Sequence, residues 1–282
     1  MRILITGAGG QLGRAVTSRF GHGCEVAAFP EEALDVTDGA AVFRAVHSVR
    51  PQVVLHPAAL TNVDACETDP EAAFRVNALG TRNVAMACLE EGALLVYIST
   101  DYVFGGDKGA PYTEFDRPGP INVYGHSKLA GEEYVRQIIP RHLIVRTAWL
   151  YSGRGEIDFV HTVLSLLATG REIAMVDDQH GSPTYVPHLA AALEGLVREE
   201  VLGTYHLAGT GECSRFEFAR AIARLTGRDP ECIRPVPTSA FPRPARRPCR
   251  TSLRCYVAEL EGRPPLPPWE AALEEELRLH VD

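Results

Sequence analysis

The chain has 282 residues, enough for one large domain or two smaller ones, and its 45% hydrophobic and 23% charged content excludes a disordered chain. A formal net charge of −8, with no basic stripe interleaved with aromatic residues, argues against a nucleic-acid binder. No apolar run reaches the roughly 18 residues of a membrane helix, and no signal peptide precedes the first strand-like segment, so we expect a cytoplasmic protein that makes no membrane contact. The seven cysteines form no CxxC pair, so we expect reduced thiols and no zinc site.

The first 150 residues alternate short β-branched segments with helix-like stretches. Strands are expected at Ile3–Thr6, Val26–Phe29, Val53–His56, Leu94–Ser99 and Leu143–Thr147. Helices are expected at Gln11–Phe20, Asp38–Val49, Pro70–Glu90 and Tyr124–Gln137. Short strands separated by helices are typical of βαβ units. We therefore predict an α/β fold, with a Rossmann-like doubly wound parallel sheet in a dinucleotide-binding domain over residues 1–150.

The pattern becomes less regular after residue 150. Helices are expected at Asp158–Ala168, His188–Glu199, Arg215–Thr226 and Trp269–His280, with strands at Glu172–Val176 and Thr204–Leu207. Dense prolines predict a loop from Pro235 to Pro248. Residues 151–282 are predicted to form mainly a smaller C-terminal α/β domain that binds substrate, with some segments able to return to the first domain.

A glycine-rich turn follows the first predicted strand. Gly7, Gly10 and Gly13 are spaced three residues apart and lead directly into a helix. A turn without side chains lets a pyrophosphate approach the backbone, and the helix N-terminus offers free N–H groups with a partial positive charge. Because the turn follows the first strand of a βαβ chain, we predict that Gly7, Gly10, Gln11, Leu12 and Gly13 bind a dinucleotide.

The choice between NADPH and NADH depends on residues near the second strand. That strand ends in Phe29-Pro30, without the acidic residue that binds the ribose 2′-hydroxyl of NAD. Arg14 is the nearest candidate for a 2′-phosphate, and its alternative role is that of a solvated helix residue. Asp35 and Val36 are expected beside the adenine, although Asp35 could equally be a turn residue. We expect NADPH, with NADH possible.

Tyr124 and Lys128 are four residues apart at the start of a predicted helix, so their side chains share one face. An ammonium about 4 Å from a phenol stabilises the phenolate, and we expect it to lower the pKa of Tyr124 into a range useful for acid–base catalysis. Lys128 could also bind the nicotinamide ribose. The alternative is that Lys128 pairs with Glu132 on a solvated helix face.

Hydroxyl groups follow the fourth predicted strand. Active groups of this fold gather at the carboxyl ends of strands, and a hydroxyl there can donate to a carbonyl that is being reduced. We choose Thr100 for this role, with Ser99 as the second candidate. Tyr102 is expected to point toward a sugar, and its alternative is a packed surface aromatic.

Taken in order, these motifs resemble the extended short-chain dehydrogenase/reductases and, among them, the dTDP-4-dehydrorhamnose reductase family. The resemblance covers nearly the whole chain. The segments that carry it are Gly10–Gly13, His56–Asp64, Ser99–Phe104, Tyr124–Lys128, Arg146–Tyr151, Asp178–Thr184 and Arg247-Pro248.

The resemblance implies reduction of the C4 ketone of dTDP-4-dehydro-L-rhamnose to dTDP-L-rhamnose, with Tyr124 as proton donor. It makes Thr100, Tyr124 and Lys128 the catalytic residues. It implies that Tyr102 and Trp149 contact the sugar together with Thr100. It places Ala58, Ala59 and Asn77 near the cofactor, although Asn77 could equally be a buried polar residue satisfied by the backbone. Ser99, Tyr124 and Lys128 are also expected to bind the cofactor.

The sequence departs from the family pattern at two places. Some relatives have a magnesium-binding glutamate shortly after the glycine turn, where this chain has Arg14-Ala15, so we expect no metal. Many relatives have asparagine where this chain has Asp158, which we expect to cap a helix. We expect the protein to be a monomer or a homodimer.

Two alternatives remain open. One is another nucleotide-sugar epimerase, reductase or 4,6-dehydratase of the extended short-chain family, although Tyr102 stands where the dehydratase needs a glutamate. The other is a non-catalytic regulator that resembles the beta subunit of methionine adenosyltransferase, because fold does not fix function.

Overall fold

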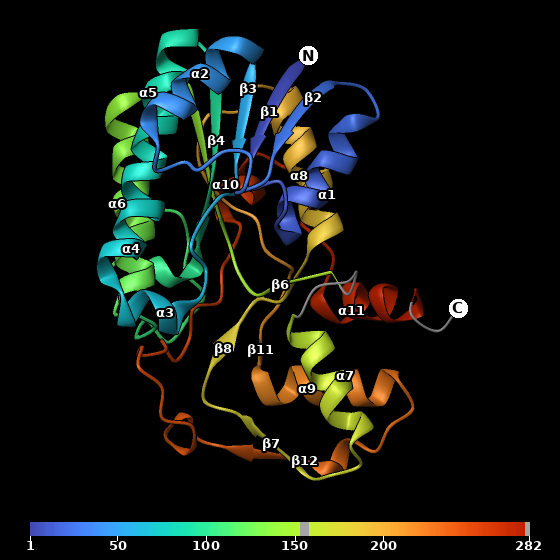
Figure 1. The fold of residues 1–282 in the computed structure, drawn as a ribbon. Helices are drawn as coiled ribbons and strands as arrows, with labels where there is room; N and C mark the ends of the chain where they lie inside the picture. Colours follow the sequence, from blue (N-terminus) through green and yellow to red (C-terminus); the bar gives the residue numbers. More distant parts are fainter. Residues whose placement is uncertain (153–157, 280–282) are drawn as a thin grey trace.

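A parallel sheet forms the centre of the larger lobe of the molecule (Figure 1). The computed structural model describes residues 1–152 and 158–279. In that part of the chain the largest sheet has six strands in the order β10-β5-β4-β3-β1-β2, and every pairing within it is parallel. Its strands are β1 (Arg2–Thr6), β2 (Glu25–Phe29), β3 (Val53–His56), β4 (Leu94–Thr100), β5 (His142–Thr147) and β10 (Gly203–His206). The predicted doubly wound α/β fold is confirmed.

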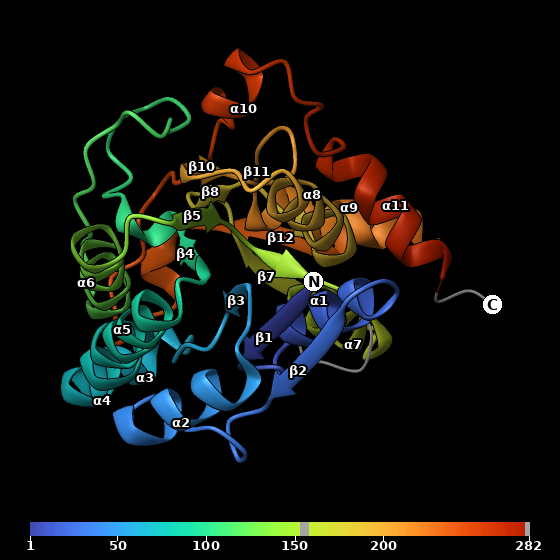
Figure 2. The same ribbon diagram turned by 90° about the horizontal axis from the view of Figure 1, so that it is seen from above.

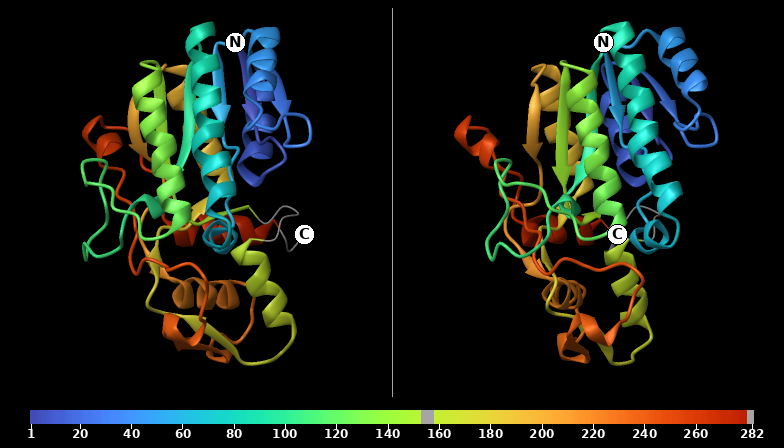
Figure 3. Two further views of the ribbon diagram at one scale, coloured as in Figure 1. Left: turned by 60° about the vertical axis from the view of Figure 1, so that its left-hand side comes forward. Right: turned by 90° about the vertical axis from the view of Figure 1, so that its left-hand side faces the viewer.

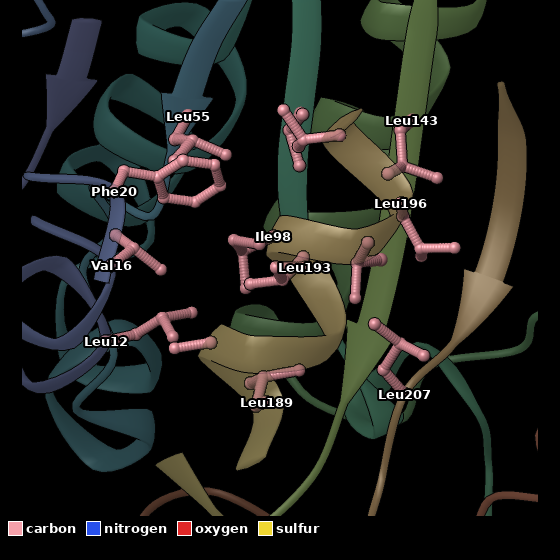
Figure 4. Close-up of a cluster of buried hydrophobic side chains, with 14 of the residues drawn as sticks. Leu12, Val16, Phe20, Leu55, Ile98, Leu143, Leu189, Leu193, Leu196 and Leu207 are labelled. Carbon is pink, nitrogen blue, oxygen red and sulfur yellow. The ribbon is translucent and has the colours of Figure 1, made fainter. Parts of the chain in front are cut away.

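Helices cover both faces of this sheet (Figure 2). One face packs against α1 (Gln11–Gly21) and α8 (Val186–Arg198). The other packs against α2 (Gly39–Val49), α5 (Thr81–Glu91) and α6 (Val123–Ile138). Figure 4 shows the first of these cores, in which Val16 and Phe20 of α1 face Leu193 of α8 beside the sheet. Because both faces are covered, the central strands are continuous apolar runs, which made them visible in the sequence.

The second half of the chain contributes to both lobes. Strand β10 joins the edge of the large sheet beside β5, and α8 covers the same sheet. Most of the remaining elements form a smaller lobe beyond the carboxyl ends of the strands (Figure 3). Its core gathers side chains from α7 (Phe159–Ala168), α9 (Arg215–Leu225) and α11 (Trp269–Arg278). Short strand pairs complete it: β7 (Ile173–Val176) with β12 (Ile233–Val236), β8 (His180–Gly181) with β11 (Cys213–Ser214), and β6 (Leu150–Tyr151) with β9 (Thr184–Tyr185).

Two predicted elements need correction. The expected helix Pro70–Glu90 is divided into α4 (Pro70–Phe74), a π-helical turn (Arg75–Gly80) and α5. The expected loop from Pro235 begins two residues later, at Pro237, because Pro235 and Val236 belong to β12. A two-stranded pair tolerates proline, since one side of each strand needs no ladder partner. The last predicted residue of the C-terminal helix, His280, lies outside the described residues.

Two short helices were not expected from the sequence. Asn62 accepts a hydrogen bond from the Ala65 amide and begins α3 (Val63–Thr68). The other is α10 (Tyr256–Leu260), which packs against the edge of the large sheet. Both are too short to show a helical period. None of the helices in the described residues is long and apolar enough to cross a membrane.

Candidate active site

A cavity of about 760 Å³ opens at the carboxyl ends of β1, β3, β4 and β5. In this fold ligands bind where the strand order reverses, here between β1 and β3. Most of the residues singled out from the sequence share its wall. Those on the wall are Gly7, Gly10, Gln11, Leu12, Gly13, Asp35, Val36, Ala58, Ala59, Ser99, Thr100, Tyr124, Lys128 and Trp149.

The glycine turn leaves no room for side chains. Gly7 has φ of +58°, and a Cβ on it would lie 2.6 Å from the Cα atom of Ala58. A Cβ on Gly13 would lie 2.2 Å from the carbonyl oxygen of Gly7. Gly10 is the N-cap of α1 and supplies no capping side chain. The first turn of α1 therefore faces the cavity as an anion-binding surface, which fits a dinucleotide pyrophosphate.

We expect Gly13→Ala to weaken NADPH binding about tenfold or more, because the added methyl group must push the turn away from its present position. Gly21→Ala, at the other end of α1, is the matched control, because a Cβ there meets nothing within 4 Å. Fluorescence titration with NADPH measures both dissociation constants. Equal affinities in the two variants would contradict this use of the turn.

Asn77 and Tyr102 are the two predicted site residues that are not on the cavity wall. Asn77 is fully buried: its Oδ1 accepts from the Leu60 amide at 2.8 Å, and its Nδ2 donates to the Leu60 carbonyl at 3.1 Å and to Ser127 Oγ at 3.0 Å. It therefore holds the Ala58–Thr61 loop from behind. The Tyr102 ring stands edge-on to the Tyr124 ring, with centroids 5.9 Å apart.

The residues considered for cofactor preference lie at one end of the cavity. Asp35 is on the wall, and its carboxylate also accepts from the Thr37 amide at 2.8 Å, as a turn residue does. The Arg14 guanidinium donates to the Gly9 carbonyl of the glycine turn. Glu31 and Glu32 line the cavity as well. The cavity thus offers both acidic groups and one nearby arginine to the adenosine end of a dinucleotide.

Helix α6 brings Tyr124 and Lys128 to the end of β4. It starts where the Asn122 side chain accepts from the Gly125 amide at 2.9 Å. Lys128 is 2% exposed, and its Nζ donates to the Ile98 carbonyl at 2.7 Å and lies 4.2 Å from the centre of the Tyr97 ring.

The interpretation of Lys128 as one half of a solvated pair with Glu132 is wrong. Glu132 instead binds Arg146 through two hydrogen bonds and Arg136 through a third, and it accepts from Ser99 Oγ at 2.6 Å. Burial would raise the pKa of Glu132, but the arginines hold that pKa below its usual value.

The pKa of Tyr124 shifts in the direction opposite to the one predicted from the sequence. Burial raises the pKa of Tyr124 above its usual value, and a hydrogen bond with Thr100 opposes the rise. Burial also lowers the pKa of Lys128 to about 7. The expectation that the ammonium lowers the pKa of Tyr124 is therefore wrong, because the cost of placing a phenolate in the interior is the larger effect. The phenol stays protonated, as a proton donor must.

A chain of hydroxyl and carboxyl groups continues behind Tyr124. Thr100 Oγ1 donates to Asp101 Oδ1 at 3.0 Å and accepts from the Tyr102 amide at 3.2 Å. Thr251 Oγ1 donates to the other oxygen of Asp101. Burial raises the pKa of Asp101 to about 6. These contacts fix the Thr100 hydroxyl at the cavity wall beside Tyr124.

Sequence reasoning missed Thr147, whose hydroxyl is buried and has no hydrogen-bond partner within the described part of the chain. Its position at the end of β5, on the cavity wall, is the signal that could have found it. The prediction that Asp158 caps a helix is confirmed, because its Oδ1 accepts from the His161 amide at 2.9 Å at the start of α7. Its Oδ2 also accepts from Gln11 Nε2 at 3.2 Å.

Two buried histidines should make the protein sensitive to acid. Burial lowers the pKa of His56, behind the Ala58 loop, and that of His206, on β10, to about 3. Between about pH 3 and 6.5 the unfolded chain binds protons that the folded chain does not, so stability is lost as pH falls below about 6.5. Each histidine contributes up to about 1.4 kcal/mol per pH unit.

Urea unfolding between about pH 8 and pH 5 measures this loss. His206→Asn should reduce the slope of the unfolding free energy against pH. His22→Asn, at an exposed position, should leave that slope unchanged. A slope that is the same in wild type and His206→Asn would show that His206 does not contribute.

Comparison with known proteins identifies close relatives. A family model described as RmlD substrate binding domain matches residues 1–280. A curated protein of Mycobacterium tuberculosis named dTDP-4-dehydrorhamnose reductase is 43% identical over 278 residues, covering 96% of this chain and 91% of its own length. One of Streptomyces niveus, named dTDP-4-keto-6-deoxy-D-glucose reductase, is 37% identical over 276 residues, covering 97% and 96%. The crystal structure of a dTDP-4-dehydrorhamnose reductase from Bacillus anthracis in complex with NADP is 41% identical, covers 98% of both chains and superposes with a TM-score of 0.94.

Proposed function

The chain belongs to the dTDP-4-dehydrorhamnose reductase family of oxidoreductases, and we propose that it uses NADPH to reduce the C4 ketone of dTDP-4-dehydro-L-rhamnose to dTDP-L-rhamnose. The observation that carries the proposal is one cavity in which the glycine turn meets Thr100, Tyr124 and Lys128. A dinucleotide site joined to a proton donor is what a ketone reduction requires.

The cofactor end of the cavity fits NADPH. Gly7 and Gly13 form a cradle that a Cβ would fill, so the pyrophosphate would lie against the backbone and the N-terminus of α1. Arg14, held on the same turn, would bind the 2′-phosphate. The NADP complex of the Bacillus anthracis relative supports this choice. The KM ratio of NADPH to NADH tests it, and Arg14→Gln should shift that ratio toward NADH.

The catalytic residues would share the work of proton transfer. NADPH, when bound, supplies the hydride. Tyr124 donates its phenolic proton to the C4 oxygen, because burial keeps the phenol protonated until a stronger base appears beside it. Thr100 turns its hydroxyl proton from Asp101 toward the same oxygen. Lys128 holds the nicotinamide ribose from a fixed position on the Ile98 carbonyl.

The smaller lobe would bind the sugar nucleotide, which places Trp149 at the sugar. Helices α7, α9 and α11 supply the core of this lobe, whereas α8, β10 and α10 pack with the large sheet. Trp149 lines the cavity and has φ of +46°, a conformation that an L-residue rarely adopts. Gly181 of β8 packs against it, since a Cβ there would lie 2.3 Å from the indole Cε2 atom. We infer that Tyr102 and Trp149 contact the sugar beside Thr100.

A coupled assay tests the proposal. The purified protein is incubated with dTDP-4-dehydro-L-rhamnose and NADPH, and cofactor absorbance and product are followed together. We expect one NADPH oxidised for each dTDP-L-rhamnose formed. Turnover without net NADPH consumption would instead indicate an epimerase or dehydratase, and cofactor binding without turnover would indicate a regulator.

A second substrate is favoured by the Streptomyces niveus relative, named for dTDP-4-keto-6-deoxy-D-glucose. That sugar carries the same C4 ketone and differs in ring stereochemistry, so the same proton donor would serve. We expect the higher kcat/KM for the rhamnose precursor, because the relative named for it is the more similar one.

A further inference from the structure

Arg215 is the first residue of α9, which is labelled in Figure 1, and it stacks on Trp149 of the cavity wall. Its guanidinium carbon is 3.4 Å from the centre of the Trp149 ring system and 4.9 Å from that of Phe159. Trp149 is thus held by Arg215 and by the close approach of Gly181. Stacking uses the faces of a guanidinium and leaves its N–H edge available for hydrogen bonds in the plane.

That edge has no partner among the residues that the structure describes. Within residues 1–152 and 158–279, the Arg215 side chain makes no hydrogen bond or ion pair, although it is half-buried. Two other arginines near Tyr102 are partly neutralised, because Asp64 Oδ2 lies 3.0 Å from Arg247 and 3.5 Å from Arg243. A half-buried cation that forms no ion pair with the described residues is costly, so its presence favours a negatively charged ligand.

The charge of Arg215 acts on two groups beside Thr100 and Tyr124. Burial raises the pKa of Tyr102, and the charges of Arg215, Arg247 and Arg243 each oppose that rise. Arg215 also acts on Asp101, which lines the cavity next to Thr100.

We propose that Arg215 binds the diphosphate of the nucleotide sugar through its N–H edge while its face fixes the Trp149 indole beside the sugar. The inference rests on the proposed function for the identity of the substrate. A planar guanidinium matches two phosphate oxygens, and such charge-assisted hydrogen bonds are the stronger ones in proteins. Arg215 thereby selects substrates that carry a diphosphate.

The test compares two probes, thymidine diphosphate and thymidine, which differ only in the diphosphate. Calorimetry measures the dissociation constants of both for wild type, Arg215→Gln and Arg215→Lys. The matched control is Arg224→Gln, an exposed arginine near the other end of α9. NADPH affinity and circular dichroism verify that each variant is folded.

We expect Arg215→Gln to weaken thymidine diphosphate binding about 10- to 100-fold, the range for a lost hydrogen bond to a charged group, and thymidine binding less than about threefold. Arg215→Lys should recover part of the affinity, and Arg224→Gln should behave as wild type. KM for the nucleotide sugar should rise in parallel, with kcat within about threefold.

Equal losses for both probes would mean that Arg215 only supports Trp149, and an unchanged thymidine diphosphate affinity would also overturn the inference. Calorimetry needs no turnover, so these outcomes stay readable if wild type reduces no sugar nucleotide. That last result would contradict the proposed function alone.

Discussion

Replacing Tyr124 with Phe is expected to lower kcat by about 10²- to 10⁴-fold, the contribution of a positioned general acid. The variant loses one hydroxyl from a buried ring, whose edge-on contact with Tyr102 remains possible. NADPH affinity should stay within a few-fold of wild type, because the glycine turn is untouched. Steady-state kinetics and fluorescence titration measure the two quantities separately.

The control for this variant is Tyr134→Phe, farther along α6 and away from the cavity. It should retain wild-type kcat. Near-wild-type turnover by Tyr124→Phe would remove the phenol from the mechanism. A loss of turnover matched by a loss of NADPH binding would mean that Tyr124 acts on the cofactor rather than on the ketone.

Replacing Glu132 with Ala is expected to destabilise the protein by about 3–5 kcal/mol, the cost of leaving a buried charge without its partner. Glu132 is fully buried, and Arg146, 2% exposed, donates to both of its oxygens at 2.9 and 2.8 Å. Few other single changes in this molecule would remove so much of a total stability of about 5–15 kcal/mol. Urea unfolding measures the change.

Glu194→Ala is the control for this second prediction. Glu194 pairs with Arg19 and Arg198 near the surface, and the loss of such a pair costs about 1 kcal/mol or less. If the two variants unfolded at the same urea concentration, the buried pair would not stabilise the core beneath α6.

The large sheet and the glycine turn could be predicted because their signals are local. Each central strand is a short apolar run, and Gly7 to Gly13 follow the first of them directly. The predicted ends of helices and strands were wrong where contacts with distant parts of the chain decide them. The π-helical turn at Arg75–Gly80 has no sequence period of its own, and β12 includes Pro235 because its partner β7 needs no amide there.

The gathering of candidate residues at one cavity was predictable where strand ends and helix spacing define it, as at Thr100, Tyr124 and Lys128. It was not predictable where distant segments meet: Thr251 reaches Asp101 across 150 positions, and Arg215 reaches Trp149 from another lobe. The predicted direction of the pKa shift of Tyr124 was wrong, because a sequence shows the neighbouring charge but not the burial that outweighs it.

Transfer of a labelled hydride tests the central claim most directly. The protein is given dTDP-4-dehydro-L-rhamnose with NADPH carrying deuterium at both positions of the nicotinamide C4, and the product is analysed by NMR. The account predicts one deuterium on C4 of the rhamnose and none elsewhere. A product without deuterium at C4, or a label found at another sugar carbon, would contradict it.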